Sequence, residues 1–219
     1  MSESVNLLTL PQQYPHGDRL HVAPAVWLFE NFASSEELSA LMEAAWEKLR
    51  PAEVSGDQDG YISPGRTSSN CWVNHDYNAL TLQLAERISK LIKIPLINAE
   101  SFQVVYYGPS QEYQAHFDSW DDDTERGRRC MERGGQRLVT ALLYLNYVEA
   151  GGSTSFPKLQ LDVNPIPGNL LLFHNCYPGT TNKHENSLHG GMPVSQGEKW
   201  AANLWFRERD YRWPVIKNP

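Results

Sequence analysis

The chain has 219 residues and a formal net charge of −7, with 41% hydrophobic and 11% aromatic residues. A chain of this length forms one large or two small domains, and its negative charge argues against a nucleic-acid partner because such proteins carry basic patches. It has no apolar run near the ~18 residues of a membrane-spanning helix and no signal-peptide pattern at its start, so we expect a cytoplasmic protein without a membrane partner.

Two helices are predicted before residue 95. Ser34 and Glu37 form a capping-box pattern at the start of an amphipathic run that ends at Pro51. A second apolar stripe at helical spacing covers residues 78–92. The intervening residues 51–70 are polar and rich in glycine and proline, and we predict a long loop there that is a candidate lid.

From residue 100 onward the pattern changes to short strands separated by turns. The predicted strands cover residues 100–108, 114–120, 137–148, 169–173 and 199–208. The charged residues 119–136 are predicted to form a surface loop. Together these elements favour a sandwich or barrel, and hence a mainly β fold with flanking helices (α+β). We expect a single domain over residues 1–219, with a helical N-terminal support over about 1–95 and a β core over about 96–210.

The stretch HFDSW, residues 116–120, places a histidine and an aspartate one residue apart. On a strand, residues i and i+2 face the same side, so His116 and Asp118 would point to one place while Phe117 would point into a core. A third metal ligand must come from elsewhere in the chain. His189 is the strongest candidate because two glycines follow it and permit close backbone approach, although a lone histidine is usually a surface or core residue.

The strand predicted after His189 carries a lysine on its inward face. Alternation places Lys199 on one face together with Ala201, Asn203 and Trp205. This lysine either extends to water at the strand end or pairs with an anion, because burying an unpaired ammonium group is costly. Two histidines and one carboxylate form the facial triad typical of non-haem Fe(II) oxygenases. The three open positions would take a 2-oxo acid and dioxygen, and Lys199 would pair with the far carboxylate of that acid.

Several stretches together resemble the prolyl 4-hydroxylase family of 2-oxoglutarate-dependent dioxygenases. The resemblance is carried by YYGPSQEYQAHFD, GGQRLVTALLYLNYVEAGGSTSFP, PIPGNLLLF and SLHGGMPVSQGEKWAANLWF, and by RTSSNCW at residues 66–72. These motifs cover about half of the chain in the order typical of the family. The resemblance implies a double-stranded β-helix, or jelly-roll, core with N-terminal helices packed outside it.

The same resemblance implies roles for individual residues. Fe(II) would be held by His116, Asp118 and His189. The co-substrate 2-oxoglutarate would be bound by Lys199, Tyr107, Thr154 and Trp205, with O2 as the second co-substrate and ascorbate as a candidate accessory reductant. A peptide substrate would be contacted by Arg66, Ser68, Glu100, Tyr113 and Arg137. For Arg66, Ser68 and Arg137 the alternative is that they are ordinary polar residues of a loop or a strand edge.

The first hypothesis for the function is prolyl 4-hydroxylation of a protein or peptide. The alternatives are a hydroxylase of a free amino acid or other small molecule, and a non-catalytic metal- or 2-oxoglutarate-binding sensor barrel. The presence of every core residue argues against the sensor, and a long loop carrying Arg66 suits a peptide. Two features depart from the family pattern: Arg207, where relatives often carry a histidine, and the charged insert SWDDDTERGRRCMER. Both bear on the substrate rather than on the reaction.

Overall fold

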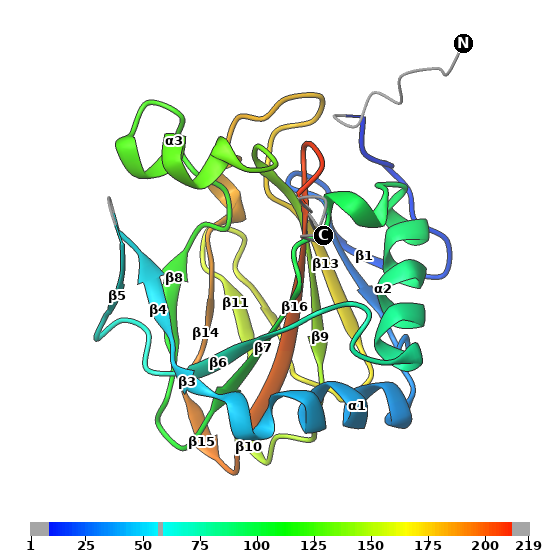
Figure 1. The fold of residues 1–219 in the computed structure, drawn as a ribbon, viewed down its shortest axis with the longest axis vertical. Helices are drawn as coiled ribbons and strands as arrows, with labels where there is room; N and C mark the ends of the chain where they lie inside the picture. The colour runs from blue at the N-terminus through cyan, green and yellow to red at the C-terminus, as the bar shows by residue number, and fades with distance from the viewer. Residues whose placement is uncertain (1–8, 57–58, 212–219) are drawn as a thin grey trace, which may run out of the picture.

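The computed structural model describes residues 9–56 and 59–211, and its largest element is a sheet of eight strands (Figure 1). The strands are β1 (Asp18–His21), β2 (Val26–Phe29), β3 (Arg50–Pro51), β6 (Ser69–Val73), β7 (Phe102–Tyr107), β9 (Arg137–Tyr144), β13 (Leu170–His174) and β16 (Lys199–Arg207). Their order across the sheet is β1-β2-β13-β9-β16-β7-β6-β3, with every pairing antiparallel. The predicted strands over 100–108, 137–148 and 199–208 are confirmed with shorter bounds, and the strand predicted over 169–173 is confirmed with a shift of one residue.

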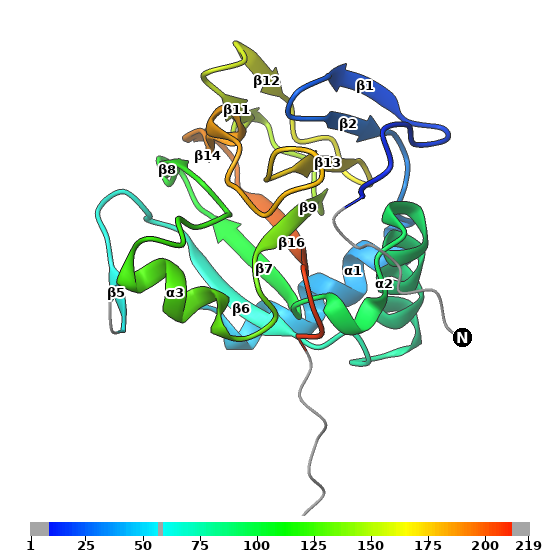
Figure 2. The ribbon, with the colours of Figure 1, turned by 90° about the horizontal axis from the view of Figure 1, so that it is seen from above.

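A second sheet of four strands forms the opposite layer (Figure 2). Its strands are β8 (Tyr113–His116), β11 (Thr154–Phe156), β12 (Leu161–Val163) and β14 (His189–Gly191), in the order β12-β11-β14-β8. Two short ribbons complete the β structure: β4 (Glu53–Ser55) with β5 (Gly60–Ile62), and β10 (Ala150–Gly151) with β15 (Val194–Gln196). Two antiparallel sheets that enclose a common interior are the jelly roll that the resemblance implies, so this fold class is confirmed.

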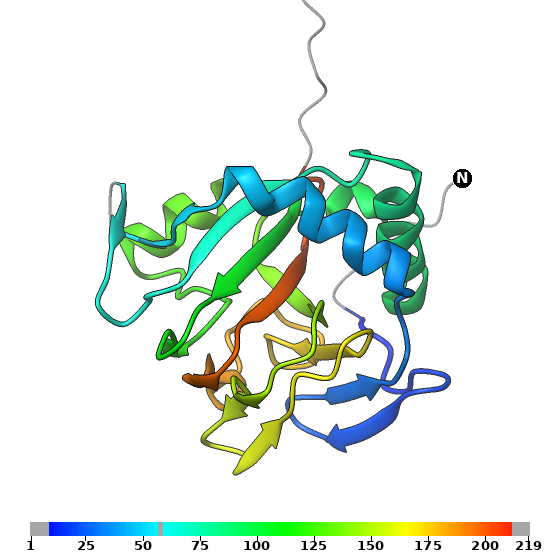
Figure 3. The same cartoon turned by 90° about the horizontal axis from the view of Figure 1, so that it is seen from below.

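Two helices lie against the outer face of the main sheet (Figure 3). These are α1 (Ser35–Ala45), which continues into a 3-10 helix (Trp46–Lys48), and α2 (Ala79–Ile92). The capping box at Ser34 is present, because its hydroxyl accepts from Glu37 N and the Glu37 carboxylate accepts from Ser34 N. Two further 3-10 helices cover Leu96–Asn98 and Glu185–Ser187. Within the described ranges, no helix combines the length and apolar character that crossing a bilayer requires.

The N-terminal half contains more strand than the sequence predicts. Residues 51–70 are not a plain loop, because their described part includes the β4–β5 hairpin and the start of β6. Four strands that precede residue 95, β1, β2, β3 and β6, belong to the main sheet, so the N-terminal support contains strands as well as the two predicted helices. These strands are short and lie at or near the sheet edges, where few apolar residues are needed and periodicity is weak.

The charged segment 119–136 also differs from its prediction, because it contains the helix α3 (Glu125–Glu132). Thr124 caps this helix by accepting a hydrogen bond from Gly127 N at 3.0 Å. Gly127 is the single buried residue of the helix, so no apolar stripe marks it in the sequence. Figure 1 shows α3 above the open end of the two sheets, next to the β4–β5 hairpin.

Candidate functional site

Three candidate metal ligands converge at the open end of the jelly roll. His116 is the last residue of β8 and His189 is the first of β14, and the two are register partners in the four-stranded sheet. Asp118 follows the end of β8, and its Oδ1 and Oδ2 lie 3.6 Å from His116 Nε2 and 3.5 Å from His189 Nε2. All three ligand atoms lie within 4.8 Å of one another. The structure therefore brings together the triad that the sequence predicts.

Phe117 does not lie where strand alternation predicts. It is half-buried, lines the cavity of the site, and its ring lies 4.5 Å from Lys183 Nζ. Because β8 ends at His116, strict alternation stops one residue before Phe117. The convergence of His116 and Asp118 is thus a property of the strand end rather than of a continuing strand.

The two histidines are oriented by backbone carbonyl groups. His116 Nδ1 lies 2.9 Å from Gln114 O, and His189 Nδ1 lies 2.9 Å from Ser187 O. A carbonyl oxygen only accepts, so each Nδ1 carries the proton and each Nε2 presents a lone pair to the centre. Burial lowers the pKa of His189 to about 4, which favours the neutral ring that binds metals. Both imidazoles are therefore held in the tautomer that a metal site requires.

Asp118 is buried and held by two side-chain donors. Its Oδ2 accepts from Thr140 Oγ1 at 2.7 Å and from Trp205 Nε1 at 2.8 Å, which fixes the plane of the carboxylate. Burial raises the pKa of Asp118, but the facing His189 and His116 outweigh it and hold that pKa well below its usual range. The carboxylate is ionised, as a metal ligand must be.

These donors fit a mononuclear metal ion. Two imidazole nitrogens and one carboxylate oxygen on one side of a common point are the donor set of the non-haem Fe(II) oxygenases. Within the described ranges, this is the one cluster of at least three such side chains with converging ligand atoms. The chemistry and convergence of the donors thus agree with a resident Fe(II).

A buried lysine marks the inner end of the site. Lys199 is 3% exposed, and its Nζ donates to Gly152 O at 2.6 Å and lies 5.3 Å from the ring centroid of Tyr107. No described carboxylate lies within ion-pair distance of Nζ, and burial lowers its pKa to about 7. Nearby, Thr154 Oγ1 accepts from Tyr144 OH at 2.9 Å. This end offers an unpaired ammonium with hydroxyl groups beside it, which suits an anionic group.

The cavity that connects these groups has a volume of about 640 Å³, the size of a small-molecule site. Ten of the twelve site residues predicted from the sequence line it: His116, Asp118, His189, Lys199, Tyr107, Thr154, Trp205, Arg66, Tyr113 and Arg137. Ser68 and Glu100 do not; they are 2% and 1% exposed and lie behind its wall. A direct peptide contact by Ser68 or Glu100 would therefore require that wall to move.

Two side chains of the predicted peptide-contacting set form one wall of the cavity. Tyr113 stacks on His116 with ring centroids 3.6 Å apart, and the Arg66 guanidinium lies 4.4 Å from the Tyr113 ring centroid. Arg66 is anchored from behind by Gln103 Oε1 at 3.2 Å and Glu53 O at 2.8 Å. Arg66 is therefore a fixed part of the wall rather than a free loop cation.

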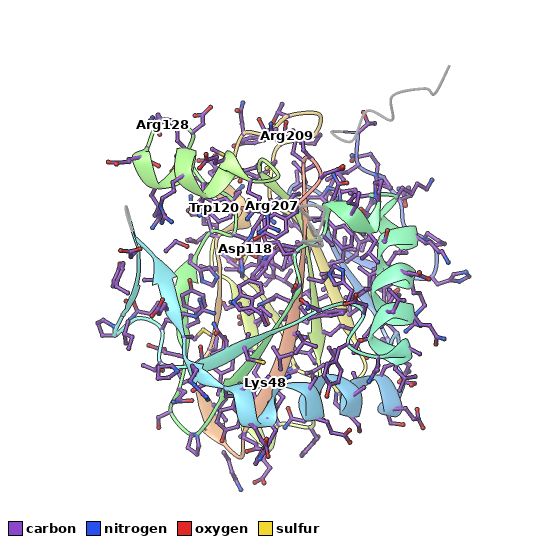
Figure 4. All side chains as sticks on the ribbon, in the orientation of Figure 1. Lys48, Asp118, Trp120, Arg128, Arg207 and Arg209 are labelled. Carbon is purple, nitrogen blue, oxygen red and sulfur yellow. The ribbon has the colours of Figure 1, made fainter. Side chains whose placement is uncertain are left out.

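Arg137 forms another wall, supported by a buried ion cluster. Its Nε and Nη2 donate to Glu100 at 2.6 and 2.8 Å, and its guanidinium lies 3.6 Å from the Trp205 ring centroid. Arg207 Nε donates at 2.6 Å to Glu100 Oε1, the oxygen that also accepts from Arg137 Nε. Figure 4 shows Arg207 and Trp120 between α3 and Asp118. Glu100 thus positions Arg137, and Arg207 ties this cluster to the α3 segment through Cys130 O and Gly135 O.

Two supporting residues, Thr140 and Tyr144, were not identified from the sequence. The pairing of Arg207 with a buried carboxylate was not identified either. Thr140 and Tyr144 share the inward face of β9 with Leu142, which lines the cavity. Polar groups at alternate positions of an otherwise apolar strand are the signal that could have identified them. The charged partner of Arg207 is far away in sequence and left no local signal.

Comparisons with known proteins agree with this geometry. The jelly roll and the two-histidine, one-carboxylate cluster define the class of mononuclear non-haem iron oxygenases. The 2OG-Fe(II) oxygenase superfamily matches residues 102–207. A putative prolyl 4-hydroxylase of Acanthamoeba polyphaga mimivirus is 37% identical over 84% of this chain and 75% of its own length. A probable prolyl 4-hydroxylase of Arabidopsis thaliana is 32% identical over 88% of this chain and 66% of its own.

A solved structure gives the same result. The viral collagen prolyl hydroxylase of Paramecium bursaria Chlorella virus-1, in its 2OG complex, superposes with a TM-score of 0.64 and 29% identity. The alignment covers 83% of this chain and 95% of that one. The chain belongs to the prolyl 4-hydroxylase family of Fe(II)- and 2-oxoglutarate-dependent dioxygenases.

Proposed function

We propose that this dioxygenase hydroxylates proline, at C4, in a protein or peptide. The reaction converts the proline C–H, 2-oxoglutarate and O2 into hydroxyproline, succinate and CO2. The observation that carries the proposal is the cavity in which the triad His116, Asp118 and His189 and the unpaired Lys199 face one space. The relatives named as prolyl 4-hydroxylases support proline as the substrate residue.

The chain's own residues supply position and charge. His116, Asp118 and His189 would hold Fe(II), which together with 2-oxoglutarate and O2 supplies the oxidative decarboxylation and C–H hydroxylation. Lys199 would pair with the distal carboxylate of 2-oxoglutarate, and its ammonium form is favoured by that anion. Burial raises the pKa of Tyr107 to about 12, so its neutral hydroxyl is available as a hydrogen-bond donor to the same carboxylate, beside Thr154.

Peptide-binding roles are proposed for the outer wall. Arg66, Tyr113 and Arg137 would contact the substrate directly, because each lines the cavity, whereas Trp205 is proposed to line the 2-oxoglutarate pocket. Glu100 acts through Arg137 as a positioning residue. Ser68 is proposed to help shape the same wall from behind.

The proposal extends to the chain as a whole. Strands from before and after residue 95 share the main sheet, which supports one catalytic domain over residues 1–219. A cytoplasmic location is supported by Cys71, Cys130 and Cys176, which form no disulfide and so suit a reducing compartment.

Succinate release tests the proposal. Anaerobically iron-loaded protein is mixed with 2-oxoglutarate and O2, with and without a proline-containing peptide, beside the Asp118→Ala and Lys199→Ala variants. We expect peptide-stimulated succinate and peptide mass increased by one oxygen, loss of both in Asp118→Ala, and partial rescue of Lys199→Ala at high 2-oxoglutarate. Succinate formation that no peptide stimulates would refute a peptide substrate, and the absence of succinate from a folded, metal-loaded protein would refute catalysis.

A further inference from the structure

The cavity has the opposite charge to the rest of the protein. Among the described residues, seven arginines and lysines line it, against three carboxylates, Glu53, Asp118 and Asp121. The whole chain, in contrast, has a net charge of −7. A cleft with one dominant sign of charge concentrates field lines and attracts ligands of the opposite sign.

Five of the charged side chains that line the cavity are accounted for by the site itself. Lys199 and Asp118 are assigned to the co-substrate and the metal ion. Arg137 is paired with Glu100 behind the wall, and Lys183 Nζ lies 2.6 Å from Asp121 Oδ2. The remaining positive charge therefore belongs to the substrate-facing part of the cavity.

Three arginines there have no described carboxylate within ion-pair distance: Arg50, Arg66 and Arg126. Their hydrogen bonds go chiefly to backbone carbonyl groups, Arg50 to Leu49 O at 2.7 Å and Arg126 to Ser55 O at 3.3 Å. A neutral carbonyl orients a guanidinium but does not cancel its charge. Arg50 and Arg126 are also exposed to solvent.

The exposed pair comes from two separate elements of the cavity wall. Arg126 lies on α3, and Arg50 lies on β3 beyond the β4–β5 hairpin, and both line the one cavity. In Figure 4, α3 lies above Asp118. Lys48, which lies two residues before β3, is well below Asp118 in the same view. A peptide that passes the metal site would therefore meet a cation on each side.

We propose that the substrate is an acidic peptide segment, with glutamate or aspartate side chains flanking the target proline on one or both sides. This inference rests on the proposed function, because it concerns the peptide that occupies the same site. The flanking carboxylates pair with Arg50 on β3 and Arg126 on α3, while Arg66 adds positive potential from the wall beside Tyr113. Such pairs act on encounter and affinity rather than on the chemical step.

Peptide binding provides a test that does not depend on turnover. Three fluorescent peptides share one proline-containing core and are flanked by Glu, Gln or Lys. Their affinities are measured by anisotropy under anaerobic conditions, with Mn(II) and 2-oxoglutarate present, at low and high salt. We expect the Glu-flanked peptide to bind most tightly, the Lys-flanked peptide most weakly, and the difference to shrink at high salt.

Charge-removal variants locate the effect. Arg50→Gln and Arg126→Gln are each expected to weaken binding of the Glu-flanked peptide by about two- to fivefold, as exposed ion pairs do, with little effect on the Gln-flanked peptide. Arg128→Gln is the matched control, because Arg128 is exposed on the same helix, binds Asp122 O and Asp123 O, and does not line the cavity. It should bind all three peptides as the unchanged protein does.

The outcomes separate this inference from the proposed function. Equal binding of the Glu- and Gln-flanked peptides, an equal loss in Arg128→Gln, or no binding of any peptide would overturn the acidic preference. Tight, salt-sensitive binding of the Glu-flanked peptide without peptide-dependent succinate would support the preference and overturn the hydroxylation. Peptide-dependent succinate formation without any charge preference would support the hydroxylation and overturn the acidic preference.

Discussion

Replacing Thr140 by valine is expected to weaken metal binding by about 10- to 100-fold. Thr140 is fully buried, and its hydroxyl donates to Asp118 Oδ2 at 2.7 Å while accepting from Asn175 Nδ2 at 2.9 Å. Valine occupies nearly the same volume but has no donor, so the carboxylate keeps only the Trp205 bond to fix its plane. A hydrogen bond to a charged group contributes about 1.5–3 kcal/mol, which agrees with this loss of affinity.

Anaerobic titration with Mn(II) or Fe(II) measures the effect, and urea unfolding measures stability in parallel. Thr81→Val is the matched control, because Thr81 is also fully buried and its hydroxyl donates to His75 O at 2.8 Å, but it lies on α2 away from the carboxylate. Both variants should lose about 1–3 kcal/mol of stability. Only Thr140→Val should lose metal affinity; an unchanged affinity in that variant, or an equal loss in the control, would refute the reasoning.

Two further predictions follow from buried charges. Burial lowers the pKa of Lys199 to about 7, whereas a bound carboxylate favours its charged form. The affinity for 2-oxoglutarate should therefore be flat below pH 7 and fall by up to about tenfold per pH unit above it, because binding then takes up a proton. Calorimetry at pH 8.5 in two buffers of different ionisation enthalpy measures this proton uptake. The absence of uptake would contradict the prediction. Arg207→Lys should destabilise the fold by about 1–3 kcal/mol, since one ammonium cannot replace the donors to Glu100, Cys130 O and Gly135 O. An unchanged urea midpoint would show that these bonds contribute little.

The parts that were predictable from the sequence follow short-range rules. Helix α1 is marked by its capping box, both α1 and α2 are marked by a 3.6-residue apolar period, and the inward face of β16 is marked by strict alternation. The cluster of His116, Asp118 and His189 depends on one close pair and one histidine before two glycines. Each of these signals spans a few residues, so the sequence alone is sufficient to detect it.

The parts that were missed depend on partners far away in the chain. Arg207 and Glu100 are separated by 107 residues, and Thr140 and Asp118 by 22, so no local pattern links them. Helix α3 is nearly all polar and has no apolar stripe to reveal it. Long-range contacts of this kind are decided by the packing of the two sheets, which composition and periodicity do not specify.

The pairing of His116 with His189 across β8 and β14 restricts where this chain can change in length. A one-residue insertion or deletion within either strand turns its side chains to the opposite face, which would withdraw a histidine from the metal. The connection between Asp118 and β9 has no such restriction, because its length does not alter the pairing of β8 with β14. An engineer who wishes to lengthen this protein should therefore do so in the connections, such as the segment that carries α3, where added residues would reach the cavity wall while both histidines keep their places.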